Sequence, residues 1–280
     1  MSLAENLTNM PEAELRRQFE KEGYIVVRGL LDPDEVERYK VELQRLSGLD
    51  DSRFDPDPER RESWTKPDGV TTEPTFWPLI TDERLTSLVR ALLGPNARYT
   101  QHSDLHVHHG DPGWHRDSAD RVYGVGRDWD ESRAPYAVAR VAIYLQSFEQ
   151  SRSKLGVMPG THRREPRFAE KERAIMGTLS KLLPKQRRPL TSPFVTMRPK
   201  WIDTQPGDCV IFNQRLYHSS SITYGPKYSL FMSYGVENEH SVNHRRYYMF
   251  ERQDLRYGDY PEPLAEELRR NDLYLPLGSG

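Results

Sequence analysis

The hydrophobic positions in the first part of the chain recur mostly at the helical period. Three segments combine this period with an acidic first turn or a closing glycine, and the short apolar run YIVVRGL is typical of a strand. We therefore expect helices at residues 11–23, 32–46 and 81–94 and a strand at 24–30. Residues 49–74 are polar and rich in proline and aspartate, which predicts a long surface loop.

From residue 96 onwards the pattern changes to short alternating or apolar segments bounded by turn residues. It predicts strands at 97–109, 136–148, 155–160, 194–202, 208–213, 216–223 and 228–236. A helical insert is expected at 171–185, and a last helix at 262–271. Strands and helices do not alternate in this part, which argues against a parallel doubly wound sheet. The pattern predicts a mainly β protein with flanking helices, built as an antiparallel sandwich or barrel.

At 280 residues, the chain has the length of one large domain or two small ones. It contains no repeats and no low-complexity linker, so we expect a single domain over residues 1–280. We divide that domain into a helical N-terminal part at 11–95, a β-barrel core at 96–250 and a C-terminal helix at 261–272.

Composition narrows the classes of partner. The net charge is only −2, which gives no overall attraction to nucleic acid or anionic membranes, and the basic run at 185–189 is expected to be a solvated loop. No segment approaches the ~20 apolar residues of a membrane span, and no secretory signal is visible. The single cysteine, Cys209, is expected to be buried and fits a reducing compartment. We expect a cytoplasmic monomer or homodimer that binds a small molecule.

The stretch GDPGWHRDS at residues 110–118 carries the first candidate chemistry. His115 and Asp117 are two apart, so in an extended or turn conformation both side chains can face one point. An imidazole and a carboxylate are two ligands of the 2-His-1-carboxylate triad that binds non-haem iron and leaves one face open. Such a pair also arises by chance on protein surfaces, and the third ligand has to come from elsewhere in the fold.

A second group of candidates lies near the end of the strand-rich part. His218 stands inside a strand pattern, and Lys227 follows nine residues later at the start of the next predicted strand. A basic side chain there could hold the distal carboxylate of a dicarboxylate co-substrate. Taken separately, His218 could equally be a core histidine and Lys227 a solvated hairpin residue.

Taken together, these segments resemble the phytanoyl-CoA dioxygenase family of Fe(II)/2-oxoglutarate oxygenases. The resemblance spans roughly residues 14–250. It rests on five segments that occur in the family's order and spacing: residues 23–39, 114–117 (WHRD), 156–163 (GVMPGTHR), 206–220 (PGDCVIFNQRLYHSS) and 227–234 (KYSLFMSY).

The resemblance implies a double-stranded β-helix, a jelly-roll or cupin-like barrel. It implies that His115, Asp117 and His218 are the iron ligands and the catalytic centre. The implied cofactors are Fe(II), 2-oxoglutarate as co-substrate and O₂, with ascorbate as a reductant in vitro.

The resemblance also indicates how 2-oxoglutarate is held. The family usually has an arginine where this chain has Lys227, and an ammonium supplies the charge without the bidentate fork of a guanidinium. Arg215 is a possible substitute, and Ser220 could add a hydroxyl donor. For the C1 end we expect His106, because Asp104, His106 and His108 share one strand face by the period of two.

The reaction implied by the resemblance is oxidation of an unactivated C–H bond of a small polar metabolite, with release of succinate and CO₂. Hydroxylation is the default, because the Asp117 carboxylate fills the position that chloride takes in related halogenases. Oxidative cyclisation or desaturation by the same site remains an alternative. Two further readings stay open: a non-catalytic barrel that acts as a binding module, and a cupin-like enzyme with another metal and no 2-oxoglutarate.

Substrate contacts are expected around the H-x-D turn and the segments that cover it. Residues 49–74 and 118–136 resemble cover loops, because long loops in compact domains are often functional. The candidate substrate residues are Trp114, Arg116, Tyr123, Arg140 and Arg215.

Overall fold

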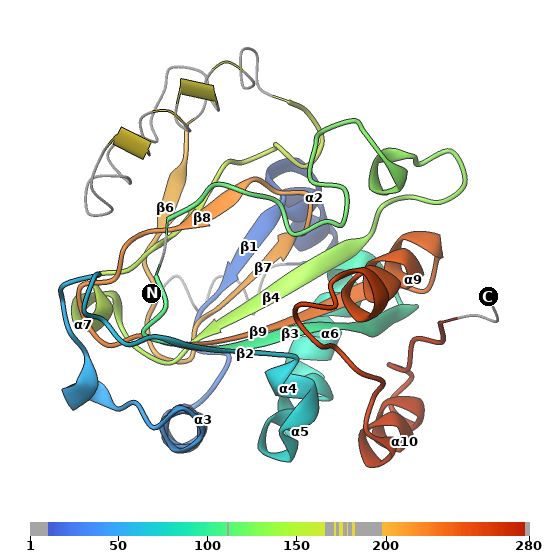
Figure 1. The fold of residues 1–280 in the computed structure, drawn as a ribbon. Helices are drawn as coiled ribbons and strands as arrows, with labels where there is room; N and C mark the ends of the chain where they lie inside the picture. Colours follow the sequence, from blue (N-terminus) through green and yellow to red (C-terminus); the bar gives the residue numbers. More distant parts are fainter. Residues whose placement is uncertain are drawn as a thin grey trace.

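The computed structural model describes residues 11–110, 112–165 and 198–277, and the single residues 171, 174, 175, 178, 181 and 182. Within these residues the strands form two sheets (Figure 1). The larger sheet has the order β1 (Tyr24–Val27), β7 (Cys209–Asn213), β4 (Val138–Tyr144), β9 (Tyr228–Val236), β3 (Ala97–Val107) and β2 (Trp64–Pro67). The smaller sheet has the order β6 (Lys200–Ile202), β5 (Leu155–Val157) and β8 (His218–Ser220).

Every strand pair in the described part of the chain is antiparallel. The smaller sheet lies over one face of the larger one, and an apolar cluster joins the two. It includes Ala142 of β4, Val157 of β5 and Phe212 of β7, all of them buried. Two packed antiparallel sheets with helices outside them are the layers of a double-stranded β-helix. The fold class expected from the sequence is confirmed.

Helices cover the opposite face of the larger sheet, where Figure 1 places α3, α4, α5 and α10. The principal core lies between this face and the helices, and it includes Leu43 of α3, Leu85 of α6 and Leu264 of α10. The long helices in the described residues are α2 (Glu12–Glu22), α3 (Pro33–Ser47), α6 (Glu83–Leu93) and α10 (Glu262–Arg270). These four correspond to the helices expected from the sequence.

Local signals explain where two of these helices begin and end. Gly23 closes α2 in the left-handed region with φ 84°, which glycine adopts without strain. Asp32 caps α3 by accepting from the Glu35 backbone N–H, while the Glu35 side chain accepts from the Asp32 N–H. This reciprocal capping box fixes the start of α3.

The loop expected at residues 49–74 is only partly a loop. It contains a 3₁₀ turn, η1 (Asp51–Arg53), the edge strand β2 and the short helix α4 (Gly69–Thr72). Strand β2 pairs on one side only, with β3 from Trp64↔Val107 to Pro67↔Asp104. Three of its four residues are only partly buried, and its sequence lacks the apolar alternation of a half-buried strand.

The β core ends earlier than residue 250, the boundary expected from the sequence. Strand β9 ends at Val236, and the chain continues as α9 (Glu239–Arg246) and a π-helix, η5 (Tyr247–Glu251). The buried side of α9 consists of polar side chains: His240, Ser241, His244 and Arg245. A helix with a polar buried face has no hydrophobic period, so the pattern could not reveal it.

The remaining elements refine the predicted boundaries. Most strands are shorter than predicted, such as β8 against the expected 216–223 and β5 against 155–160. Of the predicted 171–185 helix, the six described residues are helical, and the others lie outside the described residues. Residues 194–197 of the predicted 194–202 strand and the basic run at 185–189 also lie outside the described residues. The short helical elements are η2 (Pro74–Phe76), α5 (Trp77–Ile80), η3 (Arg127–Trp129) and α7 (Phe148–Ser151).

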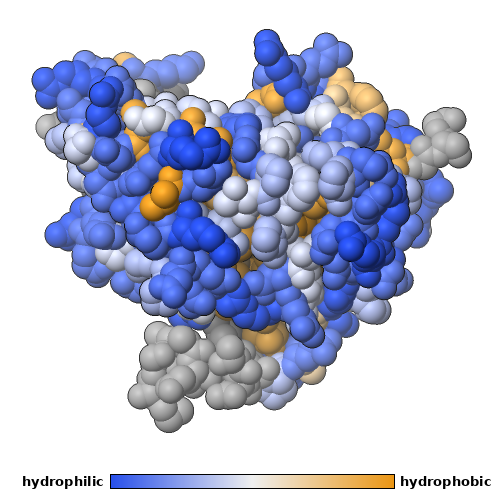
Figure 2. Space-filling view, turned by 90° about the horizontal axis from the view of Figure 1, so that it is seen from below, coloured by the Kyte–Doolittle hydropathy of each residue, from blue (hydrophilic) through white to orange (hydrophobic). Residues whose placement is uncertain are grey.

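The surface and the single thiol fit the expectations from composition. Hydrophobic residues on the face shown in Figure 2 form small separate patches among hydrophilic ones. No helix among the described residues is long and apolar enough to cross a membrane. Cys209 is buried in β7, and burial raises the pKa of its thiol, so it behaves as a small apolar side chain.

Candidate metal centre and co-substrate pocket

His115 and His218 are joined through their backbones. The N–H of each donates to the carbonyl of the other, at 2.9 and 3.0 Å, which makes an isolated antiparallel bridge next to β8. The following turn is fixed in the same way, because the N–H groups of Asp117 and Ser118 both donate to the carbonyl of Gln214. The H-x-D turn is therefore attached to the segment that contains His218.

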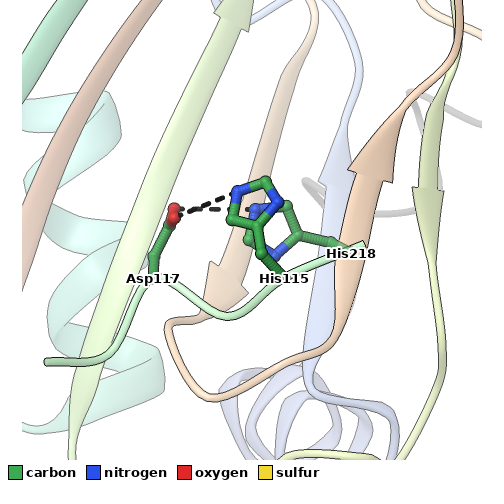
Figure 3. A group of neighbouring side chains, drawn as sticks. All are labelled: His115, Asp117 and His218. Carbon is green, nitrogen blue, oxygen red and sulfur yellow. Dashed lines mark ion pairs between the residues drawn. The ribbon is translucent and has the colours of Figure 1, made fainter. Parts of the chain in front are cut away.

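These backbone contacts bring three donor groups together (Figure 3). The side chains of His115 and Asp117 extend from the turn and that of His218 extends from β8, so that they converge. Nε2 of His115 lies 3.4 Å from Oδ1 of Asp117, and Nε2 of His218 lies 3.6 Å from Oδ2. One potential ligand atom from each residue lies within 4.8 Å of the other two, so the group can hold a metal ion.

Hydrogen bonds at the far side of each ring set the imidazole tautomers. Nδ1 of His115 lies 2.6 Å from the carbonyl of Gly113, and Nδ1 of His218 lies 2.9 Å from the carbonyl of Leu216. A carbonyl only accepts, so each Nδ1 carries the proton and each Nε2 presents its lone pair toward Asp117. Two imidazole nitrogens and one carboxylate are a donor set that fits ferrous iron.

The electrostatics of the group favour cation binding. Burial lowers the pKa of His218 to about 4, so its imidazole is neutral and free to coordinate at neutral pH. Burial alone would raise the pKa of Asp117, but its interactions with His218, His115 and Arg140 outweigh this effect and hold that pKa well below its usual range. Burial opposes the charge of Arg140 as well, yet the carboxylates of Asp104 and Asp117 raise its pKa.

Arg140 links the metal centre to the sheet. Its guanidinium forms a salt bridge with Asp104, and its Nε lies 3.6 Å from Oδ2 of Asp117. Its Nη1 also donates to the backbone carbonyl of His102 at 2.6 Å. Arg140 was expected to contact substrate, and it does line the pocket, but its main partners are these protein groups.

The three donors open into a pocket of about 550 Å³, which Lys227, Ser220 and His106 also line. Nζ of Lys227 donates to Oγ of Ser220 at 3.1 Å. In the described part of the chain no carboxylate lies within 4.0 Å of this ammonium, although its residue is only 6% exposed. Burial lowers the pKa of Lys227 to about 8. A buried cation without a carboxylate partner suits an anionic ligand.

The strand β3 departs from the alternation used to group Asp104, His106 and His108. Asp104 and His106 line the pocket, but His108 does not: it adopts φ 57° and packs against Phe54 and Tyr228. The prediction that His108 shares their face was therefore wrong. The left-handed backbone conformation of His108 breaks the alternation of the strand, so that the next residue, His109, lines the pocket instead.

Four of the predicted substrate residues lie outside the lining of this pocket: Trp114, Arg116, Tyr123 and Arg215. Trp114 stacks on Tyr217, and the buried Arg116 donates to the carbonyl of Arg215 and to Glu165. These contacts lie outside the pocket and hold the H-x-D turn in place.

Tyr123 and Arg215 are also engaged elsewhere. The Tyr123 hydroxyl donates to the carbonyl of Arg163. Arg215 pairs with Glu131, packs over Tyr136 and lines a separate pocket of about 420 Å³. This position removes Arg215 as a substitute for Lys227, because its guanidinium already has protein partners away from the metal pocket.

Sequence patterns missed several residues that line the pocket. His102 enters it from an irregular stretch of β3, where Gln101 and His102 both have positive φ and the register with β9 shifts. A bulge of this kind reverses the facing that a period of two predicts. Arg121 comes from the stretch at 118–136 that was expected to cover the site, and Tyr248, Arg252 and Leu255 come from segments without strand patterns. For Arg252 and Leu255 no sequence signal pointed to the site.

Solved structures with this fold include iron- and 2-oxoglutarate-dependent proteins. The non-heme α-ketoglutarate-dependent epimerase SnoN from nogalamycin biosynthesis is 20% identical, with a TM-score of 0.55 over 81% of each chain. HygX from Streptomyces hygroscopicus, with nickel and 2-oxoglutarate bound, is 20% identical, with a TM-score of 0.56 over 79% of this chain and 86% of its own. EctD from S. alaskensis, with bound Fe, is 22% identical, with a TM-score of 0.52 over 81% of this chain and 78% of its own. These similarities establish the fold.

The double-stranded β-helix and the convergent His-Asp-His donors define the class of non-haem metal oxygenases. Residues 19–225 match the family described as Phytanoyl-CoA dioxygenase (PhyH), and the chain belongs to this family. It is accordingly an Fe(II)/2-oxoglutarate-dependent enzyme. The comparison with curated protein sequences gives no match.

Proposed function

We propose that this enzyme hydroxylates an unactivated C–H bond of a small polar metabolite at an iron held by His115, Asp117 and His218. The observation that carries the proposal is that three donors with the required chemistry converge in the same pocket as a buried lysine that has no carboxylate partner among the described residues. Bound Fe(II) and 2-oxoglutarate supply the O₂-dependent oxidation, with release of succinate and CO₂.

In this proposal Lys227 and Ser220 hold the C5 carboxylate of 2-oxoglutarate. The ammonium is buried without a carboxylate partner, and its hydrogen bond to Ser220 aligns the hydroxyl beside it. A salt bridge to a ligand carboxylate would compensate the desolvation of Lys227. His106 lines the same pocket, and its imidazole is neutral because burial lowers its pKa, so it can donate one hydrogen bond to the C1 end.

The other residues of the chain set geometry and charge. Asp117 stays ionised beside Arg140 and occupies one metal position, which leaves no place there for chloride. Arg140 restrains the second carboxylate oxygen of Asp117. Aromatic and apolar side chains, including Tyr144, Phe212 and Phe231, line other parts of the pocket and exclude water from it.

Succinate release tests the proposal directly. Purified protein supplied with Fe(II), ascorbate and 2-oxoglutarate should release succinate slowly without substrate and faster with a substrate found by screening. His218→Gln should lose both metal binding and succinate release, because the imidazole lone pair is gone.

A matched variant separates ligand loss from general damage. His108→Gln alters a buried histidine whose side chain lies outside the pocket, and it should keep metal affinity and turnover. If wild-type protein never turns over 2-oxoglutarate and His218→Gln binds metal as tightly as wild type, the proposed function is wrong.

A further inference from the structure

The charged side chains that line the metal pocket do not balance once its ligands are counted. Two are acidic and four are basic: Asp104 and Asp117 against Arg121, Arg140, Lys227 and Arg252. Arg140 and Lys227 offset the two aspartates, and the two charges of a ferrous ion offset those of 2-oxoglutarate. Burial keeps the pocket imidazoles of His102 and His106 neutral, since it lowers their pKa values. His115 and His218 are counted as neutral metal ligands. Among the charges that line the pocket, the guanidinium groups of Arg121 and Arg252 are left over, and Arg252 has its acidic partner, Asp254, outside the lining.

Arg121 lies four residues after Asp117 at the exposed side of the pocket. No carboxylate lies within 4.0 Å of this guanidinium among the residues that the structure describes. An arginine at a pocket edge with no acidic partner is available to a ligand.

The segment that carries Arg121 is fixed rather than loosely attached. The carbonyl of the preceding Asp120 accepts from the indole N–H of Trp129 at 2.9 Å and from the hydroxyl of Ser118 at 3.1 Å. The Asp120 carboxylate accepts from the backbone N–H of Asp128 at 3.0 Å. These contacts close the loop on itself and fix the backbone at Arg121, so that binding does not have to order the loop.

Arg252 approaches the pocket from the C-terminal segment. It ends the π-helix η5, and its backbone N–H donates to the carbonyl of Tyr247 at 2.9 Å. Its guanidinium is oriented by Asp254, which accepts from Nε and Nη2 at 2.9 Å each. Asp254 is 62% exposed and does not line the pocket, so solvent screens this ion pair. Tyr248 and Leu255 on the same segment give the pocket an apolar wall beside Arg252.

We propose that the substrate is a small organic anion, a carboxylate or phosphate ester, whose charged group binds Arg121 and Arg252 while its apolar part lies along Tyr248 and Leu255. This inference rests on the proposed function, because the charge count includes iron and 2-oxoglutarate. The pocket volume of about 550 Å³ must hold 2-oxoglutarate as well, so the substrate is of small-ligand size. Arginine suits this task because its planar fork pairs with carboxylate or phosphate oxygens.

Matched acids and amides test the proposal without knowledge of the natural substrate. The protein is loaded with Mn(II) and 2-oxoglutarate, and loading is measured first. Phenylacetate, phenyl phosphate and the neutral phenylacetamide are then titrated, with paramagnetic broadening of their NMR signals reporting binding beside the metal. The Kd of each acid should be at least about tenfold lower than the Kd of the amide. The ratio of the two acids' Kd values shows whether the site prefers a carboxylate or a phosphate.

Single variants locate the anion site. Arg121→Gln and Arg252→Gln should each weaken acid binding about fivefold and leave the affinity for 2-oxoglutarate unchanged, while Arg252→Lys should restore part of the loss. Arg133→Gln is the matched control, because Arg133 is 78% exposed, pairs with Glu239 and does not line the pocket.

The outcomes separate the inference from the proposed function. Equal binding of acid and amide, no binding of either acid, or unchanged acid binding in both variants overturns the anion proposal. Failure of Mn(II) or 2-oxoglutarate to load in the first step instead overturns the proposed function.

Discussion

His115 and His218 exchange both of their backbone hydrogen bonds, although they lie far apart in the sequence. The two imidazoles are therefore brought together by strand-type pairing of the main chain. Asp117 is added to them by the hydrogen bond from its N–H to Gln214. A centre built in this way is pre-organised by the fold.

Metal removal should accordingly leave the fold intact. Protein treated with EDTA should keep its far- and near-UV circular dichroism and unfold cooperatively. Mn(II) at a hundred times its Kd should then raise the free energy of unfolding by about 2.7 kcal/mol, because it binds only the folded state. His218→Gln should show no such gain. Loss of near-UV signal in the metal-free wild type would contradict the pre-organised centre.

The Arg140–Asp104 pair should be strongly coupled. Arg140→Gln leaves the two mostly buried carboxylates of Asp104 and Asp117, each 14% exposed, without this cation, and this should lower the free energy of unfolding by about 3–5 kcal/mol. Asp104→Asn in the same protein should recover part of that loss. Urea unfolding of the wild type, both single variants and the double variant gives the coupling free energy, expected at about 1–3 kcal/mol. Additive effects would show that the two side chains act independently.

The sequence predicted the helices well because each of them combined an apolar period with a local stop or start signal. The left-handed Gly23 and the Asp32–Glu35 box are such signals, and α2 and α3 lie within one or two residues of the expected bounds. The same reasoning missed α9, whose buried face carries His240, His244 and Arg245 in place of apolar side chains. Periodicity detects burial only when the buried side chains are hydrophobic.

The candidate site was only partly open to prediction from residue patterns. The period of two correctly put Asp104 and His106 on one face, but positive φ at His102 and His108 changed which neighbours join them. The role of Arg116 depended on contacts with Arg215 and Glu165, which no spacing in the sequence expresses. Local patterns describe one strand at a time, whereas a pocket depends on how strands and loops meet.

Lys227 should destabilise the protein when 2-oxoglutarate is absent. Lys227→Met should raise the free energy of unfolding of the metal-free protein at pH 7 by up to ~3 kcal/mol, because the buried ammonium has a pKa of about 8 in place of 10.5. The same variant should weaken 2-oxoglutarate binding by about thirtyfold or more, since a buried charge pair is lost. Chemical denaturation and titration calorimetry measure the two effects. A variant that loses stability and still binds 2-oxoglutarate contradicts this role.

The titration of Lys227 predicts how both effects depend on pH. Its pKa is lower in the folded than in the unfolded chain, so the destabilisation is complete below pH 8 and fades as the pH rises from about 8 toward 10.5. Binding of 2-oxoglutarate changes in the opposite sense, because it needs the ammonium: its Kd should be constant below pH 8 and rise about tenfold per pH unit above. Kd values for 2-oxoglutarate, measured on Mn(II)-loaded protein from neutral to alkaline pH, should show this change of slope near pH 8. Lys227→Arg should remove the change of slope. If the change of slope persists in Lys227→Arg, it belongs to another titrating group.

The turn before Lys227 should control the co-substrate pocket through Gly225. A Cβ atom at Gly225 would come within 1.8 Å of the Gln150 carbonyl oxygen in α7, and that oxygen belongs to the backbone. The turn is also tied to α7 by Tyr224 and Thr223, which both donate to the carbonyl of Ser151. Gly225→Ala must therefore push the turn and Lys227 away from α7. The expected results are a loss of about 1–3 kcal/mol in the free energy of unfolding and a clearly raised Kd for 2-oxoglutarate, with unchanged Mn(II) affinity.

Gly258→Ala provides the matched control for that substitution. Apart from its own residue and its two chain neighbours, no heavy atom of the described residues lies within 4 Å of the Cβ position at Gly258, so alanine should fit there with unchanged stability and unchanged binding of both ligands. Calorimetric titrations of Mn(II) and 2-oxoglutarate on the two variants isolate the effect of moving Lys227, because the metal donors come from the H-x-D turn and β8. Equal losses of metal and co-substrate affinity in Gly225→Ala would instead mean that the turn supports the whole pocket. In that event Lys227 would not be the group whose displacement weakens 2-oxoglutarate binding.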